Sequence, residues 1–157
     1  LYDGEKITHN VPSLGWAIAD EGGGTYLGKM LVTDYYRKDM PAHLREIFKE
    51  TFGLTKDKFL THIYQEPMPG RFLASFAKFI GQQINEPYMH QLVATGFDTF
   101  ITKNVMKYEE YDKLPVHFTG SVAYYFSNIL RQVAQDKGIF VKHISEYPIA
   151  GLTLFHK

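Results

Sequence analysis

The sequence contains no cysteine, and this absence excludes several classes of function. Without cysteine the 157-residue chain cannot form disulfides, thiolate metal sites, iron–sulfur ligation or a cysteine nucleophile. An excess of one charge is also missing, because 17 basic side chains balance 17 acidic ones. A balanced chain lacks the electrostatic signature of nucleic-acid or anionic-membrane binding, so we expect neither nucleic acid nor a membrane as a partner.

Long hydrophobic runs are absent as well. No apolar stretch approaches the roughly 18–20 residues that a membrane span needs, and the first residues resemble no signal peptide. The chain also lacks an initiator Met and opens in what we interpret as the middle of a hairpin, so we expect it to be cut from a longer protein. What is present, 45% apolar and 15% aromatic residues, predicts a compact globular domain.

The hydrophobic pattern predicts an α/β fold. Strands are expected at 1–2 and 5–10 around an Asp-Gly turn, and a buried strand at 16–19. Helices are expected from Thr25 to Pro41, over 42–51, after a Thr55 N-cap, over 71–80 and from Pro87 onward. The last of these helices should bury a core stripe of Met89, Leu92, Val93, Phe97, Phe100 and Ile101. The remainder is predicted as strand 115–119, helix 122–135, strand 139–141 and a terminal helix or tail over 148–156. This order, βββαβαβα with a helical insert at about 41–85, indicates a mixed sheet.

Two glycine-containing segments are candidate binding sites. Asp20 and Glu21 end a predicted strand, and three glycines then free the backbone to approach a ligand at a helix N-terminus. The alternative is an acidic helix cap beside a flexible turn, which we favour for this segment taken alone. Segment 115–122 is a strand, a Gly-Ser turn and a helix start, where α/β proteins gather ligands. Its alternative, again favoured in isolation, is a tight turn whose Ser121 caps the helix.

Three other motifs that would indicate a specific chemistry are not matched by this sequence. Segment 23–30 nearly matches a phosphate-binding P-loop, but Met30 stands where the Mg²⁺-ligating hydroxyl belongs, so we treat the match as accidental. The histidines show no zincin spacing, and we expect no metal site in this chain. His117, on a predicted buried strand, is interpreted as a core residue. A Gly-x-Ser-x-Gly nucleophile elbow is also missing.

Three segments together resemble one family. They are Val-Pro-Ser-Leu-Gly-Trp-Ala-Ile-Ala-Asp-Glu-Gly at 11–22 with the following Gly-Thr-Tyr-Leu-Gly-Lys, Arg-Phe-Leu-Ala-Ser-Phe-Ala at 71–77, and Val-His-Phe-Thr-Gly-Ser-Val-Ala at 116–123. In this order they are similar to the N-acetylglucosamine kinase branch of the BadF/BadG/BcrA/BcrD-type ATPases. The resemblance covers nearly the whole chain.

The resemblance implies the ribonuclease-H-like fold of actin-like sugar kinases, with residues 1–157 as the C-terminal lobe. The absent N-terminal lobe would bring the phosphate loop and the catalytic Asp, so no catalytic residue is expected in this chain. It further implies ATP and Mg²⁺ as cofactors, an amino sugar as substrate, and the N-terminal lobe of the same protein as partner. A homodimer through this lobe is also expected by analogy, and the need for ATP favours the cytoplasm.

The resemblance also implies roles for particular residues. Asp20 would hydrogen-bond sugar hydroxyls beside the turn formed by Ser13, Leu14 and Gly15. The adenosine end of ATP would lie on Gly120, Ser121 and Val122, and on helix backbone at Ala74 and Ala77. Relatives usually have Asp-Glu-Gly-Ser where this chain has Gly23, and the missing hydroxyl affects the expected sugar preference.

Three hypotheses follow. The first is the lobe of an ATP-dependent kinase for N-acetylglucosamine or glucosamine, inactive by itself. The second is the ATPase activator of a radical dehydratase, which the absence of cysteine argues against because that branch ligates an iron–sulfur cluster. The third is a non-catalytic regulator of the same fold that senses a sugar, a nucleotide or a partner protein.

Overall fold

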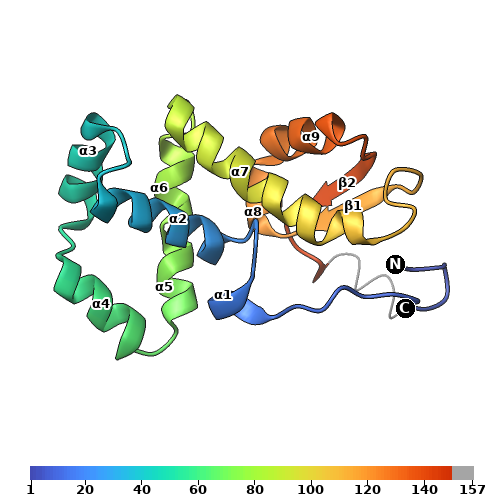
Figure 1. The fold of residues 1–157 in the computed structure, drawn as a ribbon, viewed down its shortest axis with the longest axis horizontal. Helices are drawn as coiled ribbons and strands as arrows, with labels where there is room; N and C mark the ends of the chain where they lie inside the picture. Colours follow the sequence, from blue (N-terminus) through green and yellow to red (C-terminus); the bar gives the residue numbers. More distant parts are fainter. Residues whose placement is uncertain (150–157) are drawn as a thin grey trace.

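The structure is a computed structural model that describes residues 1–149. Its elements follow the chain in the order α1 (Gly15–Ile18), α2 (Gly24–Arg37), α3 (Ala42–Phe52), α4 (Lys56–Tyr64), α5 (Pro69–Ser75), α6 (Ala77–Gln82), α7 (Pro87–Lys103), the 3₁₀ turn η1 (Val105–Lys107), β1 (Val116–Thr119), α8 (Ser121–Tyr125), α9 (Ser127–Asp136) and β2 (Val141–Ser145). The protein is therefore α/β and rich in helix. Figure 1 shows α2–α6 gathered at one end of an elongated molecule and the strands with α8 and α9 at the other.

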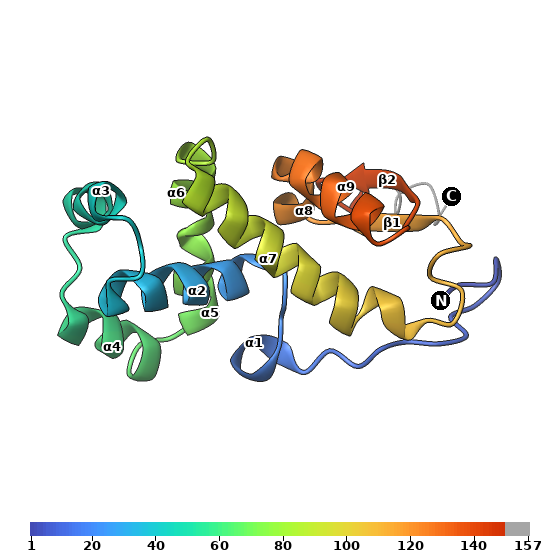
Figure 2. The ribbon, with the colours of Figure 1, turned by 45° about the horizontal axis from the view of Figure 1, so that its top comes forward.

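Helix α7 joins the two ends of the molecule. It runs diagonally through the middle in both views, with α2 and α6 near its first turns and the strands near its last (Figures 1 and 2). Five residues of its predicted core stripe are buried, namely Met89, Leu92, Val93, Phe97 and Ile101, whereas the sixth, Phe100, is half-buried. Pro87 occupies the first turn, where its missing N–H costs nothing. One face of α7 contacts α2 and another contacts α9, so a single core spans the described residues.

The helical end is held by aromatic packing and by close backbone approach. The rings of Phe48, Phe52, Phe76 and Phe79 lie 4.6–5.6 Å apart between centroids, in tilted and edge-to-face pairs. Helix α2 crosses α5 so tightly that a Cβ on Gly28 would lie 2.1 Å from the carbonyl oxygen of Leu73. The predicted Thr55 cap is confirmed, since its hydroxyl accepts the Lys58 N–H at 3.3 Å.

The strands form one parallel pair, β1 with β2, so the expected mixed sheet is not observed within residues 1–149. Parallel pairing follows because α8 and α9 carry the chain from the end of β1 back to the start of β2. The strand predicted at 139–141 begins only at Val141. His117 is exposed on β1, so its interpretation as a core residue is wrong.

The first three predicted strands are wrong. Segments 1–2 and 5–10 share a single antiparallel bridge between Tyr2 and Ile7, and both segments are exposed. Residues 16–19 are not a buried strand: α1 occupies Gly15–Ile18, and Ile18 is 78% exposed. A four-residue apolar run has no periodicity that distinguishes a strand from one helical turn. The left-handed Gly15 begins that turn, and the Ala19 N–H donates to the Gly15 carbonyl to close it.

Two predicted helices are each divided in two. The helix expected over 71–80 becomes α5 and α6, which meet at Phe76, where the amide donates to the Leu73 carbonyl three residues back. The helix expected over 122–135 becomes α8 and α9, which meet at Phe126. In both cases a buried phenylalanine occupies the junction. Most of the element predicted at 148–156 lies outside the described residues.

No helix within residues 1–149 is both long and apolar enough to cross a membrane.

Candidate functional site

Three neighbouring cavities lie between α6, α8 and the last turns of α7, beside the turn that precedes α2. The first, here the α6–α8 cavity, has a volume of about 500 Å³. The second, the central cavity, measures about 320 Å³ and the third, the α7-end cavity, about 290 Å³. Ser121 and Val122 line both the first and the second, and Asp20 and Glu21 line both the second and the third. The three cavities therefore form one continuous row.

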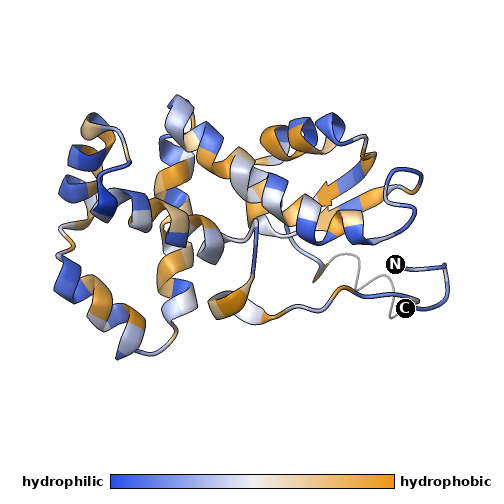
Figure 3. Cartoon of the chain, viewed as in Figure 1, coloured by the Kyte–Doolittle hydropathy of each residue, from blue (hydrophilic) through white to orange (hydrophobic). Residues whose placement is uncertain are grey.

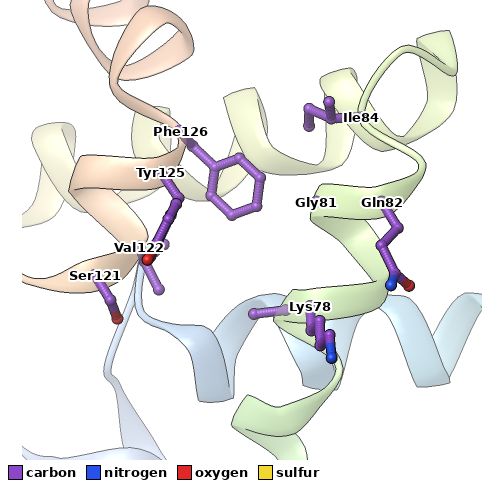
Figure 4. A pocket seen from close by; sticks show the side chains of 9 residues that line it. Lys78, Gly81, Gln82, Ile84, Ser121, Val122, Tyr125 and Phe126 are labelled. Atoms are coloured by element: carbon purple, nitrogen blue, oxygen red, sulfur yellow. The ribbon is translucent and has the colours of Figure 1, made fainter.

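The α6–α8 cavity is mainly apolar. Figure 4 shows α6 on one side and α8 on the other, with the Phe126 ring between them. Its lining residues are Ala77, Lys78, Gly81, Gln82, Ile84, Ser121, Val122, Tyr125 and Phe126. Gly81 lies beside the Phe126 ring, and a Cβ at position 81 would be in ordinary contact with that ring at 3.8 Å. An apolar cavity of this size with a few polar groups at its edge is typical of sites for small organic ligands.

Tyr125 forms one wall of that cavity and is held from outside it. Its hydroxyl donates to the Glu146 carboxylate at 2.9 Å, and this bond raises the pKa of Tyr125 above its ordinary value. Glu146 directly follows β2, so the end of the sheet orients the aromatic wall. The ring remains 69% exposed and is available to a ligand.

The turn between β1 and α8 brings backbone to the central cavity. Gly120 has φ +137°, a conformation that residues with a Cβ rarely adopt, and its N–H donates to the Ser145 carbonyl at 2.9 Å. The hydroxyls of Thr119 and Ser145 lie 3.0 Å apart across the strand ends. Ser121 is the first residue of α8, and no side chain caps this helix. The capping alternative for Ser121 is therefore wrong.

A second turn, from Asp20 to Gly23, lines the central cavity together with the turn between β1 and α8. Asp20 is left-handed with φ +74°, and the Gly23 N–H donates to its carbonyl at 3.1 Å. A Cβ on Gly23 would lie 3.2 Å from both the Asp20 carboxyl carbon and Oδ1, so this carboxylate lies beside the start of α2. Gly23 is the N-cap residue of α2 and no side chain caps it, so the acidic-cap alternative is also wrong.

Glu21 anchors this turn to α7. Its side chain is only 10% exposed and accepts a hydrogen bond from Lys103 Nζ at 3.2 Å. Hydrogen bonds from its own backbone N–H, Lys103 and Asn104 hold the pKa of the Glu21 carboxyl below its usual value, against the opposing effect of burial. The next residue, Gly22, packs so closely that an added Cβ would lie 2.9 Å from Phe100 Cβ.

The structure brings most of the predicted site residues together. Asp20 shares the central cavity with Gly120, Ser121 and Val122, although a hundred residues separate them in sequence. Ala77 joins Ser121 and Val122 in the α6–α8 cavity.

The remaining predicted residues divide into two groups. Ser13 and Leu14 line the α7-end cavity together with Asp20. Two residues line none of the three cavities. Ala74 packs against the start of α2, since a Cβ added to Gly24 would lie 3.3 Å from the Ala74 Cβ. Gly15 begins α1 with φ +76°.

Several lining residues were missed by the sequence analysis. Lys78 and Gln82 lie on α6 four residues apart, and Tyr125 lies on α8 four residues after Ser121. Helical spacing from the predicted Ser121 could have found Tyr125, whereas Lys78 and Gln82 lie one and five residues after Ala77, outside the i+3 and i+4 positions. Asn104 and Tyr108 reach the α7-end cavity from the segment after α7, and no sequence signal pointed to them. The Tyr108 hydroxyl accepts the Val11 N–H at 3.2 Å and fixes the chain leading to Ser13.

By sequence, the chain matches no described protein family and no curated protein. By structure, it is similar to a crystal structure from Porphyromonas gingivalis whose assignment as an N-acetylglucosamine kinase is provisional. The two share 36% sequence identity with a TM-score of 0.94, and the match covers 99% of this chain. It covers 54% of the Porphyromonas chain, so this chain spans about half the length of that protein.

Proposed function

We propose that this chain is the C-terminal, nucleotide- and sugar-binding lobe of an ATP-dependent kinase for N-acetylglucosamine or glucosamine. The observation that carries the proposal is the row of cavities, which brings the Asp20 turn and the Gly120–Ser121 turn to one cavity. The similarity at 36% identity to a protein provisionally assigned as a kinase for this sugar supports it. The proposal includes the BadF/BadG-type family, the ribonuclease-H-like fold and the domain limits 1–157 with the insert at about 41–85.

The α6–α8 cavity fits the adenosine end of ATP. Val122 and Ala77 offer apolar contacts, Tyr125 an aromatic wall, and Lys78 and Gln82 polar groups at the edge. From there the triphosphate would extend past Gly120 and Ser121, whose backbone forms the wall shared with the central cavity. Ala74, a residue of α5, would support this site from behind.

Asp20 fits the sugar end. Its carboxylate lies beside the start of α2 and lines both the central cavity and the α7-end cavity, with Ser13 and Leu14 on the far side. A carboxylate accepts hydrogen bonds from two neighbouring sugar hydroxyls at once. Gly15, the first residue of α1, would help to shape the wall of the sugar site.

Phosphoryl transfer needs positioning and electrostatic stabilisation more than covalent chemistry from the protein. In this chain the residues hold and orient the two substrates, and the second lobe would close over them and exclude water. Mg²⁺ would accompany the ATP phosphates. Among residues 1–149 no three His, Asp or Glu side chains converge as metal ligands, and we assign no metal residue in this lobe.

Two exposed features support a partner lobe from the same protein. Parallel sheets are normally buried on both faces. Within the described residues the parallel sheet has only two strands, so a second lobe could add to it and cover it. Helix α1 has no buried residue, and Figure 3 colours part of it as hydrophobic. Trp16 is 37% exposed and Ile18 78% exposed. A second lobe resting on α1 and on the sheet would cover these surfaces, and a homodimer through the aromatic helices is compatible with this arrangement.

The regulator remains the second candidate, because the same cavities could bind a sugar or a nucleotide as a signal. Titration of the ¹⁵N-labelled chain with Mg²⁺–ADP tests the binding site common to both. We expect amide shifts at 119–122 and 77–82, followed by shifts at 13–22 on addition of N-acetylglucosamine. If millimolar nucleotide moved none of these amides, the assignment of the α6–α8 cavity would be wrong.

A further inference from the structure

The carboxylate of Asp20 can serve a ligand only if its turn keeps an unfavourable backbone conformation. Asp20 is one of three residues other than glycine, within residues 1–149, that have a positive φ. A left-handed conformation is unfavourable for a residue with a Cβ, although Asp tolerates it better than most, so neighbouring contacts help to hold it. Its own side chain is exposed and lies over the glycines that follow it. The contacts that hold the turn must therefore come from the residues after Asp20.

Glu21 supplies these contacts. Asp20 is exposed, yet the next side chain turns inward and is 90% covered at the end of α7. There it meets Lys103, the last residue of α7, while Gly22 packs without a gap against Phe100 one turn earlier. The long distance in sequence between Glu21 and Lys103 means that the ion pair joins the turn to a rigid helix rather than to its own neighbours.

We propose that Glu21, paired with Lys103, is the positioning residue that holds the Asp20 carboxylate between the central and the α7-end cavities. This inference rests on the proposed sugar site at Asp20 and adds residues to which no role has been assigned. Glu21 lines both cavities, but its carboxylate is 90% covered and accepts a hydrogen bond from Lys103. It therefore acts through Asp20 and is not a sugar ligand. In catalysis, misplacing a positioned group by about 1 Å can cost as much as 100-fold in rate.

The test compares Glu21→Gln, Lys103→Met and the double variant in the 157-residue chain by NMR. A positive φ at Asp20 gives a strong nuclear Overhauser effect between its own amide and α protons, and this signal is independent of any ligand. We expect both single variants to weaken this signal and to raise the Kd for N-acetylglucosamine about 10-fold. The double variant should be no worse than either single one, because both act through the same contact. Lys137→Met is the matched control, since Lys137 pairs with Asp98 at 2.8 Å on the same α7 helix, away from the turn.

The outcomes separate the two proposals. If the variants lose the Asp20 signal while the wild-type chain binds no sugar, Glu21 positions the turn and the sugar assignment fails. If Glu21→Gln keeps both the Asp20 signal and the wild-type Kd, the positioning proposal is overturned. An equal loss of signal in Lys137→Met would also overturn it, because the effect would then come from general destabilisation of α7.

Discussion

The crossing of α2 and α5 makes the substitution Gly28→Ala a sharp test of the packing that supports the site. A Cβ at position 28 would lie 2.1 Å from the Leu73 carbonyl oxygen and 2.8 Å from its carbon. Both are backbone atoms, so no side chain can rotate away. The helices must separate by about 1 Å before the contact becomes tolerable, and cores resist such expansion. Because Leu73 precedes Ala74 and Ala77, the shift would also move one wall of the α6–α8 cavity.

The expected cost follows from two opposing effects. Overpacking a core costs about 3 kcal/mol, and replacing glycine by alanine within a helix returns about 1 kcal/mol. We therefore expect Gly28→Ala to lower the free energy of unfolding by about 2 kcal/mol, measured by urea denaturation followed by circular dichroism. Gly81→Ala is the control, because a Cβ there meets nothing closer than 3.8 Å and should leave stability unchanged or raised. If Gly28→Ala were as stable as Gly81→Ala, the close approach of α2 and α5 would be wrong.

Three further perturbations follow from the structure. Ala77→Phe should fill the α6–α8 cavity and abolish the Mg²⁺–ADP shifts in the NMR titration, and persisting shifts at 119–122 would place the nucleotide elsewhere. Tyr88→Phe should cost about 1–2 kcal/mol in urea denaturation, because its hydroxyl donates to Asp34 Oδ2 at 2.7 Å between α7 and α2; a neutral change would contradict this bond. Because the pKa of Glu21 is lowered in the folded chain, its stabilisation should be present above its ordinary value of 4.5 and disappear as the pH falls through the folded pKa. The stability difference between wild type and Glu21→Gln should shrink over that range, and a difference independent of pH would refute the ion pair.

Helices with long, strong patterns could be predicted from the sequence. The stripe from Met89 to Ile101 and the Thr55 cap are local signals, and the structure confirms both. The breaks at Phe76 and Phe126 were not predictable, because each depends on where a large ring finds space in the core. The segment 16–19 was assigned wrongly because four apolar residues carry no period, and the left-handed Gly15 decided its geometry.

The site could be predicted only in part, for a related reason. Glycine-rich turns are visible in sequence, so the Asp20 and Gly120 turns were identified and the structure brings them to one cavity. Their alternative roles as helix caps could be rejected only from coordinates, since capping depends on side-chain direction. The sequence could not predict the roles of Lys103 and Asn104, because they meet the Asp20 turn through a tertiary contact across more than 80 residues.

Phosphoryl transfer by the proposed two-lobed kinase is the direct test of the proposed function. A protein comprising this chain and its proposed N-terminal lobe would be incubated with ATP, Mg²⁺ and N-acetylglucosamine or glucosamine, and the products followed by ³¹P NMR, with the 157-residue chain assayed in parallel. We expect a sugar phosphate ester and ADP in equal amounts from the two-lobed protein and none from the isolated chain. A longer protein that binds nucleotide and sugar at these residues yet forms no ester would contradict the kinase assignment and favour the regulator.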